Sequence, residues 1–222
     1  MNDLRTIRVT GKGQIKLKPD MTRIYMNLNG LYKDYAETMK RSSEDTEKLK
    51  ELLEGYGFSR QDLKTRSFDV NSEYEGYQED GVYKQRFAGY RYMHELKVEF
   101  DSDNELLGRI LYGLANCDLN PELRLGYTVR DKESAKNELL GKAVADAKEK
   151  AQVLTAAAGV QLKDIRKIDY SWGEVDFEVR PMRNMVAMKM PMGTDEACGY
   201  SMDIEPDDIQ VSDTVTVVWE IA

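Results

Sequence analysis

Histidine and cysteine are scarce in this chain of 222 residues. His94 is the only histidine, Cys117 and Cys198 are the only cysteines, and no GxSxG, HExxH or DxDxDG motif occurs. Hydrolytic triads and most proton shuttles use histidine, and a structural zinc site needs clustered Cys and His ligands. We therefore expect no structural zinc site, no cofactor, no catalytic residues and no enzymatic activity. Whether the two cysteines pair in a disulfide stays open.

Long apolar runs and an excess of positive charge are also missing. No run approaches the roughly 18 apolar residues that cross a bilayer, and the start MNDLRTIRV does not have the layout of a signal peptide. Forty acidic against 32 basic residues give a net charge of -8 and a pI near 4.9, so phosphate backbones are repelled. We expect no transmembrane segment and no nucleic-acid partner, and a cytoplasmic location unless a leader has been removed.

The chain is rich in periodic apolar patterns. Alternation predicts strands and three- to four-residue spacing predicts helices, with Asp131 and Gly159 at the two ends of the last helix. The pattern amounts to about seven strands, two long helices and one short helix. The strands are expected near 7–17, 22–28, 62–74, 87–100, 121–129, 164–172 and 209–221, and the helices near 34–53, 103–116 and 131–158.

The two halves of the chain follow a similar order of elements. Gly57, Asp62 and Lys64 follow the first long helix with the same spacing as Gly159, Asp164 and Arg166 follow the last. We predict a single domain, 1–222, with pseudo-repeat halves of about 1–100 and 101–222, and an internal duplication stays open. Each half also has a long excursion within a hairpin, at 74–90 and at 174–203.

The two excursions differ in composition but share a predicted role. The first is rich in tyrosine, and the second holds five of the 11 methionines within 181–193 alone; both residue types suit protein interfaces. We expect these side chains to contact other copies of the chain in a homo-oligomer. The predicted contact residues are Tyr74, Tyr77, Tyr83, Met182, Met185, Met188, Met190 and Met192.

The methionine stretch at 181–193 also permits a different interpretation. Thioethers favour Cu(I), and MxM or MxxM spacing can bring several sulfurs together. Against this, the stretch contains no His or Cys, and Arg183 and Lys189 would repel a cation. Packing or assembly is the favoured hypothesis, and binding of Cu(I) or another small ligand is the alternative.

Two further features have structural explanations. His94 lies in phase with Leu96 and Val98 in an alternating run, so we expect a partly buried strand histidine that is hydrogen-bonded to a neighbour. Gly11 and Gly13 do not continue as GxGxxG or GKS, so they predict a bulge or a close backbone approach rather than a phosphate site.

Taken in order, three segments resemble the SIMPL-domain family, which includes bacterial periplasmic immunogenic proteins and oxidative-stress-defence proteins. The segments are IRVTGKGQIKLKPD, AVADAKEKAQVLTAAAGVQL and IEPDDIQVSDTVTVVWEI. The resemblance implies an α+β fold with a mostly antiparallel sheet, a periplasmic or cell-surface location, and self-assembly into rings or channel-like oligomers. It implies no established catalytic activity. The methionine density of 181–193 departs from the family pattern.

Overall fold

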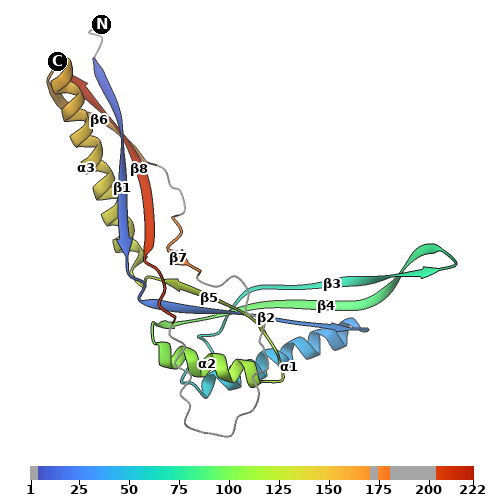
Figure 1. Cartoon of the computed structure of the whole chain (residues 1–222). Coiled ribbons are helices and arrows are strands. Elements are labelled where there is room, and N and C mark those ends of the chain that lie inside the picture. Colours follow the sequence, from blue (N-terminus) through green and yellow to red (C-terminus); the bar gives the residue numbers. More distant parts are fainter. Residues whose placement is uncertain (1–4, 171–174, 181–203) are drawn as a thin grey trace. The chain divides into compact units, whose positions relative to one another are not determined.

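The computed structural model describes residues 5–170, 175–180 and 204–222, and it has the predicted α+β class (Figure 1). Most predicted elements are found within a few residues of their expected positions. The elements in chain order are β1 (Thr6–Leu17), β2 (Met21–Tyr32), α1 (Tyr35–Glu54), β3 (Lys64–Glu79), β4 (Val82–Asp101), α2 (Asn104–Asn116), β5 (Glu122–Thr128), α3 (Lys132–Ala158), β6 (Leu162–Tyr170), β7 (Glu178–Val179) and β8 (Ile209–Ile221).

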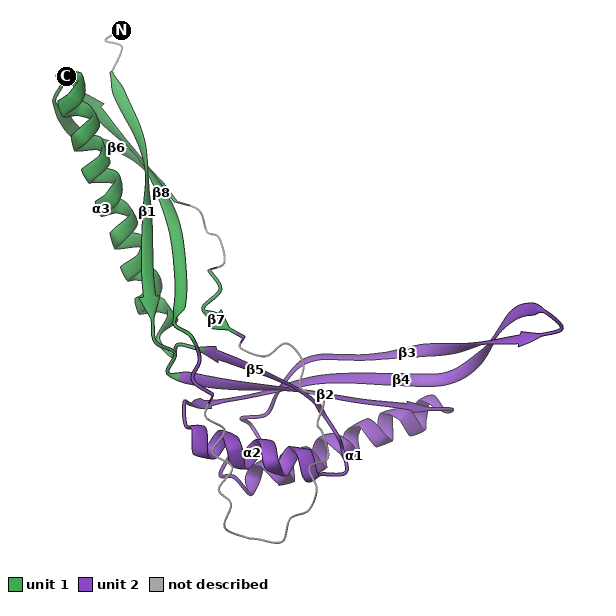
Figure 2. Ribbon diagram, in the orientation of Figure 1, with its two compact units in different colours: residues 1–20, 128–179, 207–222 green, residues 21–127, 180–206 purple. Residues whose placement is uncertain are grey.

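The strands form two antiparallel sheets and not the single sheet of about seven strands that the sequence predicted. The chain divides into two compact units, shown in Figure 2. Unit 1 comprises 1–20, 128–179 and 207–222, and unit 2 comprises 21–127 and 180–206. Both units combine segments of the two predicted halves. Alternation identifies which face of a strand is buried, but it does not identify the strand's neighbours, and this explains the difference.

Unit 1 is a three-stranded sheet in the order β1-β8-β6 with α3 packed on one face. Small side chains on α3, namely Ala143, Ala147 and Ala151, meet the apolar face of β1 and β8. A Cβ atom on Gly11 would lie 2.1 Å from the carbonyl oxygen of Ala143. This confirms the predicted close backbone approach, because only glycine leaves room for the helix there.

Unit 2 contains strands in the order β3-β4-β2-β5, with α1 and α2 on the same side of the sheet (Figure 1). The buried face of the strands includes Ile24, Met26 and Leu96, and it packs against leucines and an isoleucine of the two helices. Asp103 caps α2, since its side chain accepts hydrogen bonds from the backbone N–H groups of Glu105 and Leu106. The sheet therefore has an apolar inner face, covered by helices, and a polar outer face.

Candidate functional site: an aromatic face on the β3–β4 hairpin

The strands β3 and β4 continue as a paired hairpin well beyond the start of α1 (Figure 1). The sequence predicted a long connection at 74–90, but the pairing extends to Glu79 and Val82. Asp80 and Gly81 both have positive φ, at 53° and 79°, as a two-residue type I′ turn requires. This turn matches the right-handed twist of the strands, so the hairpin stays regular up to its tip.

Aromatic side chains follow one another along one face of this hairpin. Tyr90 lies edge-on to Tyr35, the first residue of α1, with ring centroids 5.4 Å apart. Phe87 lies 5.2 Å from Tyr90, and Tyr74 lies 5.8 Å from Phe87. We call these four side chains, Tyr35, Tyr90, Phe87 and Tyr74, the aromatic row. Edge-to-face contacts fix the rings in place, each contributing about 0.5–1.5 kcal/mol beyond area burial.

The aromatic row continues the inner face of the sheet. Tyr92, two residues from Tyr90 on the same face of β4, is fully buried in the core with α1 over it. The first residue of α1 is Tyr35, so the helix does not cover the hairpin towards its tip. The rings there are exposed, with 59% of Tyr74, 53% of Tyr35 and 39% of Phe87 accessible to solvent. The face that the helices bury at the base of the sheet is therefore not covered by any described residue along the hairpin.

Tyr83 extends this face close to the tip. It is 80% exposed, and a Cβ atom on Gly76 would lie only 3.0 Å from its ring. Since Gly76 and Tyr74 are two residues apart on β3, they share a face, and Tyr83 reaches across Gly76 onto it. An exposed run of aromatic side chains of this kind is typical of an interaction surface.

The opposite face of the hairpin is ion-paired. Arg86 bonds to Glu75 at 2.5 Å and Lys84 to Glu79 at 2.6 Å. Nearer the core Arg91 bonds to Glu73 through two nitrogens, and this contact lowers the pKa of the Glu73 carboxyl and raises the pKa of Arg91. These exposed pairs add little stability individually, but they neutralise the charges of the hairpin.

The predicted contact residues divide between the two faces. Tyr74 and Tyr83 lie on the aromatic side, whereas Tyr77 lies on the ion-paired side with the Arg86 guanidinium 5.7 Å from its ring centroid. The five predicted methionines, Met182, Met185, Met188, Met190 and Met192, fall outside the described residues. Their role in contacts or in Cu(I) binding stays a prediction.

Three members of the aromatic row were missed by sequence reasoning. Phe87 and Tyr90 are three residues apart, so they are out of phase for a regular strand, and the irregularity between Glu73 and Tyr74 brings them to the same face. Tyr35 comes from the start of a helix. A bulge signal at Ala88-Gly89, where Gly89 has a φ of 151°, could have indicated the phase change.

The outer face of unit 2 holds a shallow hollow of about 260 Å³. Tyr25 and Arg124 line it, and the guanidinium groups of Arg124 and of Arg66 lie 4.6 and 5.3 Å from the ring centroid of Tyr25. Both groups also donate hydrogen bonds to the same oxygen of Glu95, at 3.2 and 2.6 Å. Because Arg66 and Arg124 are already paired with Glu95, the hollow is a weaker candidate for a binding site than the aromatic face.

The described ranges contain neither a metal-ligand cluster nor a membrane-spanning helix. No group of three or more His, Cys, Asp or Glu side chains within 5–170, 175–180 and 204–222 is arranged to hold a metal ion. None of the helices in those ranges is both long enough and apolar enough to cross a membrane.

Comparison with known proteins agrees with the resemblance seen in the sequence. Residues 7–219 match the model of the family described as "SIMPL: Protein of unknown function (DUF541)". One relative is the "26 kDa periplasmic immunogenic protein" of Brucella abortus (strain S19), which is 28% identical over 166 residues. That match covers 73% of this chain and 65% of the relative, so somewhat less than two thirds of the relative's length is spanned. The family match extends over nearly the whole chain, and the protein therefore belongs to the SIMPL family.

Proposed function

We propose that this protein is a non-catalytic, self-assembling member of the SIMPL family, and that another copy of the same chain covers the aromatic face of its β3–β4 hairpin. The observation that carries the proposal is the continuity of the sheet's apolar face into the exposed aromatic row. Burying about 400 Å² of such surface contributes about 10 kcal/mol at ~25 cal/mol per Å², before the cost of association.

The charge of the hairpin favours a second copy as the occupant. Copies of a chain with a net charge of -8 repel one another on average. Residues 70–92, however, carry four acidic and three basic side chains, a net charge of -1. Their cross-strand ion pairs leave little repulsion at this surface, so two copies can approach each other there.

The terminal strands of the sheets favour contact through faces rather than edges. In unit 1 one of the two outer strands, β6, pairs irregularly with β8 at two places and carries Lys163, Arg166 and Lys167. The other, β1, pairs regularly and carries Arg8, Lys12 and Lys16. In unit 2 the outer strand β3 also has two irregularities, one of them beside Arg66. Bulges and charged side chains on terminal strands oppose edge-to-edge pairing between molecules. The aromatic face carries no charged side chain, because the charged residues of the hairpin lie on its other face.

The location and the biological role are also proposed. The Brucella relative is named as periplasmic, and we propose that this chain acts in the periplasm or at the cell surface of a bacterium, in a stress response as the family resemblance implies. Fractionation of cells that express the full natural protein tests the location, and recovery in the cytoplasm would contradict it.

Sedimentation across a wide concentration range tests self-assembly. The intact chain should sediment as a species larger than its monomer mass of 25.5 kDa. The double variant Tyr74→Ser/Phe87→Ser should raise the dissociation constant roughly 100-fold or more, since aromatic hot spots contribute about 2 kcal/mol or more each.

Tyr77→Ser provides the matched control for this experiment. It removes a tyrosine from the same hairpin but from the ion-paired face, so it should leave assembly unchanged. A monomer at every concentration would overturn the proposal. An equal effect of the control and the double variant would show that the aromatic face is not the contact.

A further inference from the structure

The N-terminal half of α1 is attached to β4 by polar contacts. In residues 35–46 the buried side chains are Thr38 and Ser42, whereas the buried apolar side chains of the helix, Leu49 and Leu53, lie in its C-terminal half. Three consecutive inward positions of β4 meet this polar half of the helix. We call these contacts the polar seam, which comprises Thr38, Asp45 and Thr46 of α1 and Tyr90, Tyr92 and His94 of β4.

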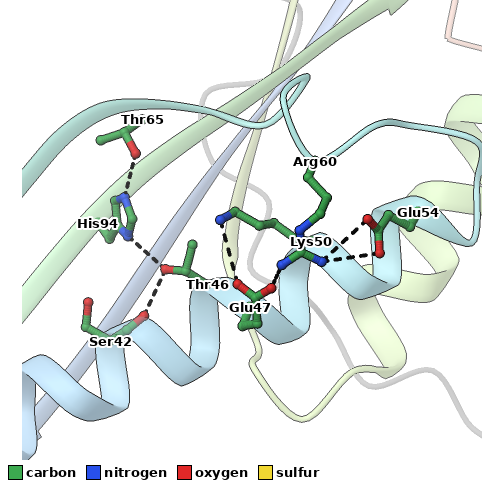
Figure 3. A network of polar contacts seen from close by, with 8 residues as sticks. All are labelled: Ser42, Thr46, Glu47, Lys50, Glu54, Arg60, Thr65 and His94. Atoms are coloured by element: carbon green, nitrogen blue, oxygen red, sulfur yellow. Dashed lines mark hydrogen bonds and ion pairs between the residues drawn. The ribbon is translucent and has the colours of Figure 1, made fainter.

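Two contacts of the polar seam are hydrogen bonds of ordinary length, and the third is weaker. Tyr92 donates its hydroxyl proton to Asp45 at 2.6 Å. Thr38 donates its hydroxyl proton mainly to the carbonyl of Asp34 at 2.8 Å, and its contact with the backbone carbonyl of Tyr90 is longer, 3.4 Å. His94, with 8% of its surface exposed, lies between Thr46 of α1 and Thr65 of β3 (Figure 3). The prediction of a hydrogen-bonded strand histidine is thus confirmed, and the ring is more fully buried than the partial burial that was predicted.

The geometry defines which nitrogen of His94 carries the proton. The hydroxyl of Thr46 donates to the carbonyl of Ser42 at 2.8 Å, so its oxygen can only accept from Nδ1–H of His94, 3.1 Å away. The other nitrogen, Nε2, then accepts from the hydroxyl of Thr65 at 2.9 Å. This arrangement satisfies a neutral ring. A second proton on Nε2 would require the Thr65 hydroxyl to turn and accept, so the cost of protonation lies in placing a positive charge at this buried position.

The surroundings of His94 do not favour a positive charge. From α1, Lys50 faces the ring, while Glu47 is paired with Lys50 and with Arg60 of the following loop (Figure 3). Asp45 of the same helix accepts from Tyr92 and lies 3.7 Å from Lys48. The neighbours from β3 and β2 are uncharged and are Thr65, Phe68 and Leu28.

Burial, and secondly the nearby Lys50, lower the pKa of His94 from its ordinary value of 6.5. Because the pKa is lower in the folded protein than in the released chain, protonation favours the released state. The contribution of His94 to the stability of the polar seam is complete above the ordinary pKa. It is lost as the pH falls from there through the folded-state pKa.

We propose that the polar seam is a proton-sensitive joint, in which uptake of a proton by His94 releases residues 35–46 from β4 while Leu49 and Leu53 keep the C-terminal half of α1 in place. Since Tyr35 leads the aromatic row, release would disrupt the proposed contact surface in acid. That consequence for assembly rests on the proposed function, whereas the release itself does not.

The single histidine makes a direct test possible, because selective ¹⁵N labelling yields signals from one imidazole only. At about pH 7.5 the ring should be neutral with its proton on Nδ1, and its titration midpoint should lie below the ordinary value. Across that midpoint the amide protection factors of residues 38–46 should fall roughly tenfold or more, and those of Leu49 and Leu53 should stay unchanged. A midpoint at or above the ordinary value, or equal loss of protection in both halves, would overturn the proposal.

Two variants separate this mechanism from general acid unfolding. Lys50→Gln removes the facing positive charge at a partly exposed position, and it should move both the imidazole titration and the loss of protection to higher pH together. His94→Gln stays neutral and should remove the acid step. If Lys50→Gln moves the midpoint of the imidazole titration but not that of the loss of protection, or the reverse, protonation of His94 does not release the helix. This test does not require His94→Gln to fold.

Sedimentation at the same pH values tests the link with assembly separately. If the oligomer dissociates over the range in which residues 38–46 lose protection, joint and assembly are coupled. If protection is lost while the oligomer persists, the proton-sensitive joint stands and its link to the aromatic face is refuted. If no oligomer forms at any pH, the proposed function fails, and the joint is judged by protection alone.

Discussion

Two helices of this protein lie on a sheet in physically different ways. In unit 1, α3 lies so close to β1 that the alanines at 143 and 147 almost touch the backbone at Gly11. In unit 2, the N-terminal half of α1 meets β4 through hydroxyl, carboxylate and imidazole groups. The α3 contact is built on alanine and glycine, and its one titrating group, Asp146, accepts from Lys150 and from the backbone N–H of Lys12, which lower its pKa. The α1 contact is built on buried polar groups, and in the proposal above it responds to protonation at higher pH.

The largest effect on stability is expected from a variant that forces α3 away from its sheet. Gly11→Ala places a Cβ atom 2.1 Å from the carbonyl oxygen of Ala143 and 2.4 Å from the amide nitrogen of Ala147. Backbone atoms cannot move aside like a flexible side chain, so we expect a loss of about 3 kcal/mol or more in the free energy of unfolding. Urea denaturation measures this loss.

Gly141→Ala is the matched control, because a Cβ atom at this position of α3 meets nothing within 4 Å. Alanine favours the helix over glycine, and a gain of up to about 1 kcal/mol is expected. Equal stability of Gly11→Ala and the unmodified chain would refute the close approach of α3 to β1.

A second pair of variants compares how strongly the two halves of α1 are held. Leu49→Ala removes a fully buried side chain from the anchored half, and we expect a loss of about 2–4 kcal/mol, measured by denaturation, because a cavity remains. Met39→Ala, in the half that carries the polar seam and at an exposed position, should cost less than about 0.5 kcal/mol. Comparable losses would mean that both halves are held by apolar packing.

The features that the sequence predicted well are those with local signals. The 3.6-residue pattern of α3 and its caps, Asp131 and Gly159, were identified correctly, since capping and amphipathicity depend on nearby residues. The close approach at Gly11 was also correct. The division into two sheets was missed, because pairing of β1 with β8 joins residues about 200 positions apart and alternation carries no information on partners.

The candidate site was predicted in part. Tyrosine density pointed to the hairpin, and Tyr74 and Tyr83 do lie on its aromatic face. Composition alone grouped Tyr77 with Tyr74, but within β3 the two are three residues apart, and alternation places them on opposite faces. Asp80-Gly81, a strong signal for a tight turn, would have predicted paired strands instead of a long connection. The polar seam has no sequence signature, since its members come from separate elements.

The smallest of these effects, and the most local, is expected at Tyr92. Burial and the hydrogen bond to Asp45 raise the pKa of the Tyr92 hydroxyl, so it remains a donor at ordinary pH. Tyr92→Phe keeps the buried ring and removes this bond, and a loss of about 1.5–3 kcal/mol is expected, as for a hydrogen bond to a charged acceptor. Hydrogen exchange should show lower protection in residues 38–46 while Leu49 and Leu53 keep theirs. Tyr74→Phe, at an exposed hydroxyl-bearing ring, should change neither quantity. If Tyr92→Phe instead weakens the whole helix equally, α1 is held as one unit, and its contrast with α3 is one of degree.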